Sequence, residues 1–171
     1  MIELRAISIL DENMPECVAL SVAPEQQEFV AANSYSLAEA FDYNKAFAEK
    51  GVGEIAVPYA VYENDVMVGF VMYGYFPPDD EDDEDAYDVE ESYYYVWRLL
   101  IDKNYQGRGI GREVVRQVME EIKAKPCGEA SYCYVSYVPS NIASKNTFLS
   151  YGFEEDGRIN GGEAVARYRL A

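Results

Sequence analysis

Apolar residues recur along the chain with two different periods, and these periods predict an alternation of strands and helices. At the start, Ile2, Leu4 and Ala6 alternate with Glu3 and Arg5, which predicts a strand over residues 2–9. Other alternating or continuously apolar runs predict strands over residues 58–63, 66–75, 94–101, 131–137, 153–159 and 164–170.

Helical patterns separate several of these strands. Residues 110–125 carry apolar side chains at a spacing of about 3.6, and Pro126 and Gly128 end this helix. Residues 24–33 are expected to form a loop or a short helical piece. Shorter helices are predicted over residues 14–20, with Asp11 or Asn13 as N-cap, over residues 36–47, with Ser36 as N-cap, and from Ser140 or Asn141 to Tyr151.

Two further features bear on the architecture. Asn64 and Asp65 are a favourable pair for a two-residue turn, so the strands on either side of them are predicted to form a β-hairpin. The 171 residues suffice for one hydrophobic core, and no internal repeat or long linker divides them. We therefore expect a single domain over residues 1–171, of the α/β (α+β) class.

A turn rich in glycine and arginine joins the strand that ends at Ile101 to the helix that follows. Free backbone N–H groups and the positive end of the helix dipole point the same way at such a turn, which makes it an anion site. Arg108 and Arg112 add positive charge, and an arginine at a helix start opposes the dipole unless an anion is bound. The alternative is a pair of solvated arginines. We interpret the turn as a pyrophosphate site. Its residues are Gln106, Gly107, Arg108, Gly109, Ile110 and Gly111.

Two other phosphate-binding loops disagree with these residues. A P-loop requires Lys followed by Ser or Thr after its last glycine, whereas Gly111 is followed by Arg112 and Glu113. The dinucleotide fingerprint requires G-x-G-x-x-G within a βαβ unit, whereas the spacing here is G-x-G-x-G after a predicted hairpin.

The formal net charge is −17, and it is unevenly distributed. Residues 1–97 hold 3 basic and 22 acidic side chains, a net of −19, and residues 98–171 hold 11 and 9, a net of +2. The acidic half disfavours nucleic acid as a partner and favours a cation, whereas the C-terminal half tolerates an anionic cofactor.

The cysteine and histidine content argues against several kinds of metal and catalytic site. The chain has no histidine, and Cys17, Cys127 and Cys133 have no C-x-x-C spacing, which disfavours a metal site and a Ser-His or Cys-His nucleophile. We expect reduced thiols in a cytoplasmic protein. No apolar run approaches the roughly 18 residues of a membrane helix, and the N-terminus lacks a basic signal-peptide region, so no membrane partner is expected.

The order of these elements and motifs resembles the GNAT superfamily of N-acetyltransferases along nearly the whole chain. A narrower resemblance, to bacterial spermine/spermidine (diamine) acetyltransferases, is carried by the segments WRLLIDKNYQGRGIG and QQEFVAANSYSLAEA. The residues that carry the broader resemblance are Gln106, Gly107, Gly109 and Gly111 in the turn, Asn141 and Ser144 in the later helix, and Gly152 and Phe153 after it.

This resemblance implies a fold and a cofactor. The fold is a central mixed, mostly antiparallel sheet of six to seven strands, flanked by about four helices and splayed between the fourth and fifth strands. Acetyl-CoA would lie in the splay as co-substrate, with its pyrophosphate on the amides of residues 107–112. A homodimer is also compatible with the resemblance. The remaining cofactor contacts would be the backbone of Leu99, Leu100 and Ile101, which could equally be plain core strand, and the side chains of Asn141 and Lys145.

The sequence departs from the family where the resemblance places a catalytic tyrosine. That phenol, seven residues after the Asn of the later helix, protonates the leaving thiolate, and here the position is Phe148. The thiolate would then leave unaided or protonated by water, or another of the 16 tyrosines would replace the phenol, or activity would be weak. We expect an active enzyme.

Acidic side chains are the candidates for binding the acceptor amine. The segment 77–92 carries ten carboxylates, and it is either a disordered, solubilising insert or a rim that attracts a polycation. Glu28 and Glu39 are further candidates, although Glu39 could instead serve in a capping box. Glu91, as general base, and Tyr94 are placed near the acceptor entrance, with a plain aromatic strand edge as the alternative for Tyr94.

These observations predict an acetyl-CoA-dependent N-acetyltransferase. The acceptor would be a primary amine of a small polycation such as spermidine or spermine, which attacks the thioester directly in a ternary complex. The alternatives are an acetyltransferase for another basic amine, either an antibiotic or a protein N-terminus, and a weakly active regulator that binds CoA or polyamine.

Overall fold

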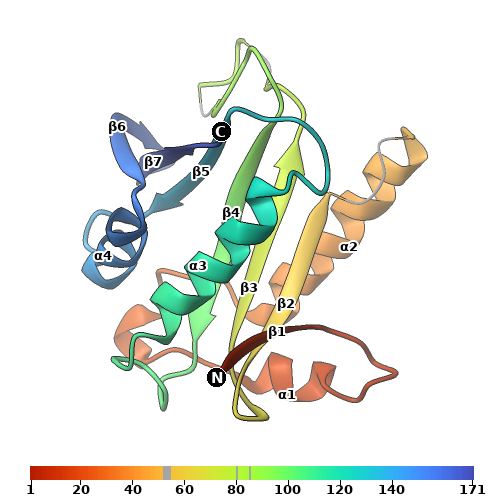
Figure 1. Ribbon diagram of the computed structural model, residues 1–171, viewed down its shortest axis with the longest axis vertical. Coiled ribbons are helices and arrows are strands. Elements are labelled where there is room, and N and C mark those ends of the chain that lie inside the picture. Colours follow the sequence, from red (N-terminus) through yellow and green to blue (C-terminus); the bar gives the residue numbers. More distant parts are fainter. Residues whose placement is uncertain (52–54, 80, 85) are drawn as a thin grey trace.

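A seven-stranded sheet with the order β1-β2-β3-β4-β5-β7-β6 runs through the computed structural model (Figure 1). The structure describes residues 1–51, 55–79, 81–84 and 86–171. The strands are β1 (Ile2–Ala6), β2 (Ala56–Glu63), β3 (Val66–Phe76), β4 (Tyr93–Ile101), β5 (Tyr132–Tyr137), β6 (Glu154–Asn160) and β7 (Glu163–Arg169). The helices are α1 (Met14–Ala19), η1 (Pro24–Gln26, a 3-10 turn), α2 (Asn33–Glu49), α3 (Ile110–Lys123) and α4 (Ile142–Tyr151). Each predicted element is present within a few residues of its expected bounds.

The sheet is mixed, as expected. Only β4 and β5 are parallel, and all other neighbouring strands pair antiparallel. The predicted hairpin is formed by β2 and β3, and its two turn residues Asn64 and Asp65 have φ angles of 49° and 65°. Positive φ at both positions is typical of the turn whose twist matches that of the two strands.

The parallel pair β4 and β5 separates after only two residue pairs. Tyr94 lies opposite Cys133 and Tyr95 lies opposite Tyr134, and no pairing follows. A β-bulge sits at the same place in β4: Met72 of β3 pairs with Arg98 and Tyr73 pairs with Val96, so Trp97 is the extra residue. A bulge bends its strand, and the two strands therefore diverge as a V. This is the predicted splay between the fourth and fifth strands.

Helices cover the sheet on both faces (Figure 1). On one face, α3 and α4 pack on the sheet through a cluster that includes Val114, Val118 and Phe148. On the other, Cys17 of α1 and Ala40 of α2 pack with residues of β2, β3 and β4. Because the aliphatic face of α3 is buried, the sheet is fixed to the helix that begins at the glycine-rich turn.

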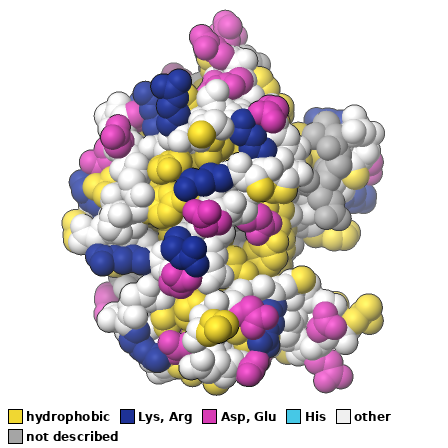
Figure 2. Space-filling view, in the orientation of Figure 1, with side chains coloured by type: hydrophobic (Ala, Val, Ile, Leu, Met, Phe, Trp, Pro, Cys, Tyr) yellow, Lys and Arg dark blue, Asp and Glu magenta, His cyan; other side chains and the backbone are white. Residues whose placement is uncertain are grey.

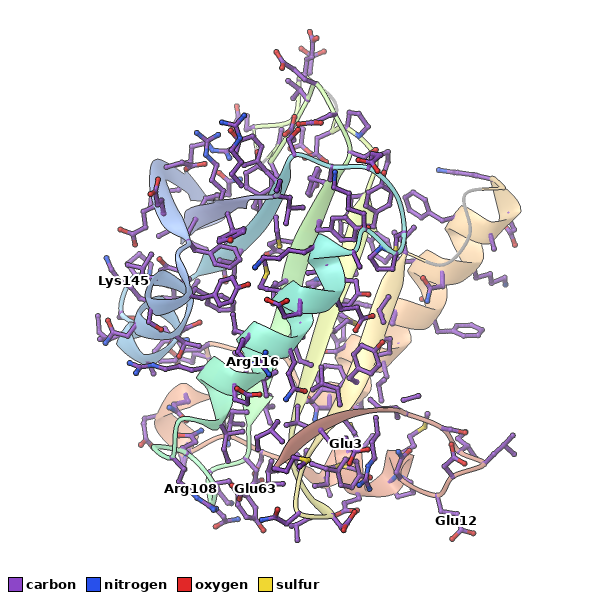
Figure 3. The ribbon with its side chains drawn as sticks, in the orientation of Figure 1. Glu3, Glu12, Glu63, Arg108, Arg116 and Lys145 are labelled. Atoms are coloured by element: carbon purple, nitrogen blue, oxygen red, sulfur yellow. The ribbon has the colours of Figure 1, made fainter. Side chains whose placement is uncertain are left out.

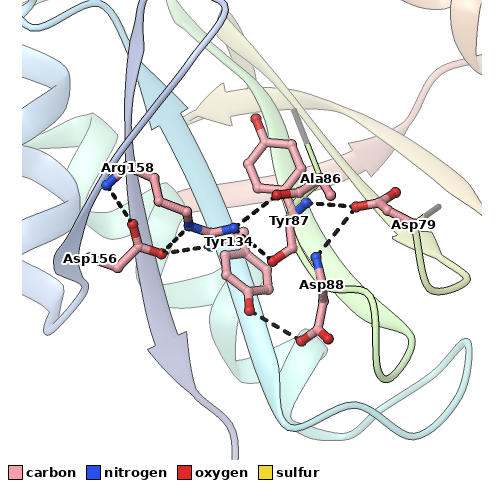
Figure 4. Close-up of polar contacts among 7 residues, drawn as sticks. All are labelled: Asp79, Ala86, Tyr87, Asp88, Tyr134, Asp156 and Arg158. Atoms are coloured by element: carbon pink, nitrogen blue, oxygen red, sulfur yellow. Dashed lines mark hydrogen bonds and ion pairs between the residues drawn. The ribbon is translucent and has the colours of Figure 1, made fainter. Parts of the chain in front are cut away.

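The acidic segment between β3 and β4 is held against the sheet (Figure 4). A carboxylate oxygen of Asp79 accepts the backbone N–H of Tyr87 at 2.7 Å, and its other oxygen accepts the hydroxyl of Tyr93 at 2.9 Å. The ring of Tyr87 packs on those of Tyr93 and Tyr134 with centroid distances of 5.8 and 5.7 Å.

The same segment is anchored from β6 and β5. The guanidinium of Arg158 donates to the carbonyls of Ala86 and Tyr87 at 2.8 and 3.0 Å, and Asp88 accepts the hydroxyl of Tyr134 at 3.2 Å (Figure 4). The described part of this segment is therefore an ordered loop rather than a disordered insert. Two of its ten carboxylates, Asp80 and Asp85, lie outside the described residues.

One predicted helix cap, Ser36, is wrong, and another, Asn13, is confirmed in position but makes no capping hydrogen bond. Helix α2 begins at Asn33, three residues before the expected cap, and the buried Ser36 donates to the carbonyl of Ala32 at 3.3 Å. Asn13 does precede α1, but its side chain accepts the N–H of Ser8 at 2.9 Å instead of capping the helix. In both cases the side chain finds a different backbone partner in the folded chain, which a local pattern does not reveal.

The contribution of the buried Tyr94 hydroxyl to stability can be tested by mutation. Its side chain is fully buried, and its hydroxyl accepts the N–H groups of Cys127 and Gly128 at 3.0 and 3.1 Å and donates to the carbonyl of Gly128. Burial raises the pKa of Tyr94 to about 12. We expect Tyr94→Phe to lower the free energy of unfolding by about 1–3 kcal/mol, because buried donors lose their acceptor.

Urea denaturation measures this effect. The matched control is Tyr75→Phe, whose more exposed hydroxyl bonds the carbonyl of Glu129 at 3.0 Å and whose loss should cost less. Equal stabilities of Tyr94→Phe and the native chain would contradict the structural role of Tyr94.

Candidate active site

A cavity of about 790 Å³ occupies the space between the diverging strands β4 and β5. Its walls are the second half of β4, the glycine-rich turn, the end of β5, the start of α4 and the segment 26–31. The cavity brings together twelve of the residues singled out from the sequence: Glu28, Leu99, Ile101, Gln106, Gly107, Gly109, Ile110, Gly111, Arg112, Asn141, Ser144 and Phe148.

The edge of β4 that faces the cavity has no strand partner. Pairing with β5 ends at Tyr95, so along residues 96–101 the backbone groups on this side are left to other partners. The backbone groups of such an edge can form hydrogen bonds with an extended ligand in the way that they would with an additional strand. The side chain of Leu100 is buried against α1 and α2, so among the three predicted backbone contacts only Leu99 and Ile101 line the cavity.

The turn has the conformation expected of an anion site. Gly107 and Gly109 have φ angles of 75° and 77°, and Gly109 is the N-cap of α3. Nothing lies within 4 Å of where a side chain would begin on either glycine, so the backbone is open. The amide of Gln106 donates to the carbonyl of Ile101 at 2.9 Å and to the side chain of Gln26 at 2.7 Å, which fixes the turn against the end of η1.

The two arginines of the turn lie in different places. Arg108 forms an ion pair with Glu63 at 2.6 Å on the β2–β3 side and does not line the cavity (Figure 3). Arg112 lines the cavity at the first turn of α3. Of the two predicted phosphate contacts, only Arg112 therefore has a side chain placed to reach an anion in the cavity.

The start of α4 forms the opposite wall. Asn141 caps this helix, because its side-chain oxygen accepts the N–H of Ser144 at 3.2 Å, and its amide group is left as a donor. Lys145 is paired with Glu155 at 3.0 Å outside the cavity (Figure 3). Phe148 lines the cavity but is 2% exposed, and its ring packs edge-on to Phe153 with centroids 5.5 Å apart.

The predicted acceptor residues are dispersed. Glu28 lines the cavity, but Glu39 is paired with Arg98 at 2.8 Å and does not cap α2. Tyr94 is buried on the α3 side. Glu91 lines a separate hollow of about 460 Å³ beside Tyr87 and Arg158, not the main cavity.

A polar cluster in the cavity was not predicted from the sequence. It consists of Tyr95 on β4, Ser136 on β5 and Glu163 on β7, with the hydroxyls of Tyr95 and Ser136 2.7 Å apart and Ser136 donating to Glu163. Burial raises the pKa of Tyr95 well above its usual range, so this phenol stays protonated. The three residues come from separate strands, and no local motif links them.

Acidic and basic side chains are interspersed over the visible face of the molecule (Figure 2). Among residues 1–51, 55–79, 81–84 and 86–171, no group of three His, Cys, Asp or Glu is arranged to hold a metal ion. None of the described helices is long and apolar enough to cross a membrane. The site therefore offers an anion-binding turn, an open strand edge and a few titratable side chains.

Similar proteins are found by sequence. A probable spermine N(1)-acetyltransferase of Bacillus subtilis subsp. natto (strain BEST195) is 29% identical over 164 residues, 92% of this chain and 93% of that protein. The spermine/spermidine N(1)-acetyltransferase of Bacillus subtilis (strain 168) is 28% identical over the same extent. These matches confirm that the sequence is similar to bacterial spermine/spermidine acetyltransferases.

Solved structures share the fold. An aminoglycoside acetyltransferase AAC(6')-Ib in complex with coenzyme A has a TM-score of 0.69 at 18% identity, covering 99% of this chain and 95% of that one. The ribosomal L7/L12 alpha-N-protein acetyltransferase RimL, in complex with coenzyme A, has a TM-score of 0.67 at 16% identity, with 99% and 94% covered.

The family itself is established by a match that includes the splayed strands, the turn and α4. The acetyltransferase (GNAT) family matches residues 20–153, which is most of the 171-residue chain. The chain belongs to the acetyltransferase (GNAT) family.

Proposed function

We propose that this acetyltransferase moves the acetyl group of acetyl-CoA to a primary amine of a small polycation, with a polyamine such as spermidine or spermine as acceptor. Membership of the family makes the chain an N-acetyltransferase that uses acetyl-CoA as co-substrate. The observation that carries the proposal is the cavity in the β4–β5 splay, which has an anion-binding turn at one end and the carboxylate of Glu163 towards the other.

The cofactor would be held mainly by backbone. Amides of the turn at Gly107 and Gly109, with the side chain of Arg112, would bind the pyrophosphate, and the open edge of β4 at Leu99 and Ile101 would pair with the pantetheine arm. The donor amide of Asn141 faces the same cavity.

The carboxylates of the cavity suit a polyamine. Glu28 and Glu163 line the cavity, and Arg98, which also lines it, is paired with Glu39. Outside the cavity, the ordered loop presents Asp88, Glu90 and Glu91 around a second hollow. This negative field would attract a ligand with several ammonium groups towards the cavity and would stabilise it once it is bound there. The two relatives named for spermine support the same acceptor.

The chemistry is a direct transfer in a ternary complex. The amine nitrogen attacks the thioester carbonyl carbon, the C–N bond forms, and the C–S bond breaks as the tetrahedral intermediate collapses. The proton that the nitrogen loses in the collapse ends on sulfur. Phe148 cannot donate a proton, but the CoA thiol is acidic enough for its thiolate to leave unaided, and water would then carry the proton from the nitrogen to the sulfur.

A second candidate acceptor is another basic amine, since structural relatives at low identity are named for aminoglycosides and for protein N-termini. The third candidate, a regulator that binds CoA with little turnover, is favoured by Phe148 alone.

The thiols of Cys17, Cys127 and Cys133 are free, which supports a reducing, cytoplasmic location. The homodimer stays a prediction.

An amine panel tests the acceptor. With acetyl-CoA in excess, we expect spermidine and spermine to release CoA thiol at rates well above those with aminoglycosides or peptides, because the sequence relatives at 28–29% identity are named for spermine. Turnover of peptides or aminoglycosides but not polyamines would contradict the acceptor. Thermal stabilisation by acetyl-CoA without thiol release from any amine would identify the regulator instead.

Phe148→Tyr tests the missing phenol. We expect this substitution to raise kcat about tenfold, because a positioned general acid then protonates the thiolate. Phe148→Leu is the matched control, since it also changes the ring but adds no hydroxyl. If both variants leave kcat unchanged or lower it equally, Phe148 does not occupy the position of a general acid.

The two arginines of the turn provide a matched pair for the cofactor site. We expect Arg112→Ala to raise the Kd of CoA about tenfold, which is about 1.4 kcal/mol, because a charge-assisted contact to phosphate is lost. Arg108→Ala should change the Kd much less, since Arg108 is paired with Glu63. Isothermal titration calorimetry measures both values, and a larger effect at Arg108 would contradict the placement of the pyrophosphate.

A further inference from the structure

The cavity has two sides that belong to opposite faces of the sheet. Phe148 packs in the same cluster as Val96 and Val135, on the face covered by α3 and α4. Tyr95 packs with Tyr134 and Val165 on the other face, beneath the acidic loop. A proton donor at the Phe148 position and a proton acceptor near Tyr95 would therefore approach the thioester from opposite sides.

The cluster of Tyr95, Ser136 and Glu163 lies at the narrow end of the V. Tyr95 is in the last residue pair before β4 and β5 diverge, and Ser136 lies two residues beyond the partner of Tyr95 on β5. Glu163 is the first residue of β7, two residues before Val165, which pairs with Ser136, so Glu163 and Ser136 share a face. All three side chains line the cavity.

The direction of the hydrogen bonds in this cluster is fixed by chemistry. An ionised carboxylate only accepts, so the single proton of Ser136 points to Glu163. Ser136 must then accept from Tyr95 at 2.7 Å, and it also accepts from Tyr87 at 3.1 Å. Two phenols thus orient one serine, and the serine holds one oxygen of the carboxylate.

The second oxygen of Glu163 is available to a ligand. Within the part of the chain that the structure describes, Ser136 is the only hydrogen-bond donor to the Glu163 carboxylate, and no lysine or arginine is ion-paired with it. By contrast, Glu39 and Glu155 are neutralised by Arg98 and Lys145. Glu163 is therefore an oriented, unneutralised carboxylate inside the cavity.

We propose that Glu163 is the general base that takes the proton from the acceptor ammonium, and that Ser136 and Tyr95 are the residues that position it. This inference rests on the proposed function, and it replaces Glu91, which lines the other hollow. The ammonium gives one N–H proton to the carboxylate and keeps the bonding pair on nitrogen. That pair forms the C–N bond, the C–S bond breaks, and the second proton lost by nitrogen ends on sulfur.

The distinction between a base and a mere anchor for the ammonium can be measured. Removing an anchor raises KM with little change in kcat, whereas removing a base lowers kcat. For Glu163→Gln we expect kcat to fall by about 10²–10⁴-fold, with an unchanged Kd for CoA. In the Glu163→Gln variant, kcat should rise by about tenfold for each pH unit up to the pKa of the free amine, roughly 10, because hydroxide in solution must then remove the proton from the ammonium. The kcat of the native protein should depend less steeply on pH.

One control accompanies this variant in the same protein. Glu154→Gln removes an exposed carboxylate on β6 and should keep kcat within about twofold of the native value. Ser136→Ala should lower kcat less than Glu163→Gln does and leave the Kd for CoA unchanged, and Ser136→Thr, which restores a hydroxyl, should recover kcat.

The outcomes separate the two claims. If the native chain acetylates an amine other than a polyamine, the proposed acceptor is wrong, and the variants are compared with that amine. If Glu163→Gln retains the native kcat, or changes only KM, the assignment of the base is overturned while the proposed function stands. If no amine supports thiol release by the native chain, both are overturned.

Discussion

The early separation of β4 from β5 is the constraint on which the site depends. Two residue pairs, Tyr94 with Cys133 and Tyr95 with Tyr134, hold the parallel strands together, and the bulge at Trp97 then turns β4 away. Backbone groups inside a protein are costly to leave without partners, so an open strand edge in a walled cavity calls for a ligand that can pair with it. The rest of the sheet, packed on α3 and α2, keeps the strands from closing the gap.

The splay also gives the reaction two sides. The turn that begins α3 places glycine amides and Arg112 at one end of the cavity, where an anion is favoured. Glu163 lies at the narrow end of the V, on the face of the sheet that the acidic loop covers, where a cation is favoured. Donor and acceptor can therefore meet at the narrow end of the V.

Much of the fold could be predicted because strand and helix periods are local. The apolar runs located every strand, and the spacing of Gly107 and Gly109 identified a turn whose positive φ angles the structure confirms. Partner choice could not be predicted, because it depends on residues distant in sequence: Arg108 pairs with Glu63, Glu39 pairs with Arg98, and Lys145 pairs with Glu155. The Tyr95–Ser136–Glu163 cluster could not be predicted for the same reason, because its three residues lie on separate strands that come together only in the folded sheet.

The central claim is that acetyl-CoA lies in the splay and pairs with the free edge of β4. Hydrogen–deuterium exchange with and without CoA tests it directly, since alternate amides of residues 96–101 face the cavity and the others bond to β3. The account predicts that CoA slows exchange at those alternate amides and in the turn at residues 107–112, with little change in β1 and β2. Protection confined to another surface, with β4 and the turn unchanged, would contradict it.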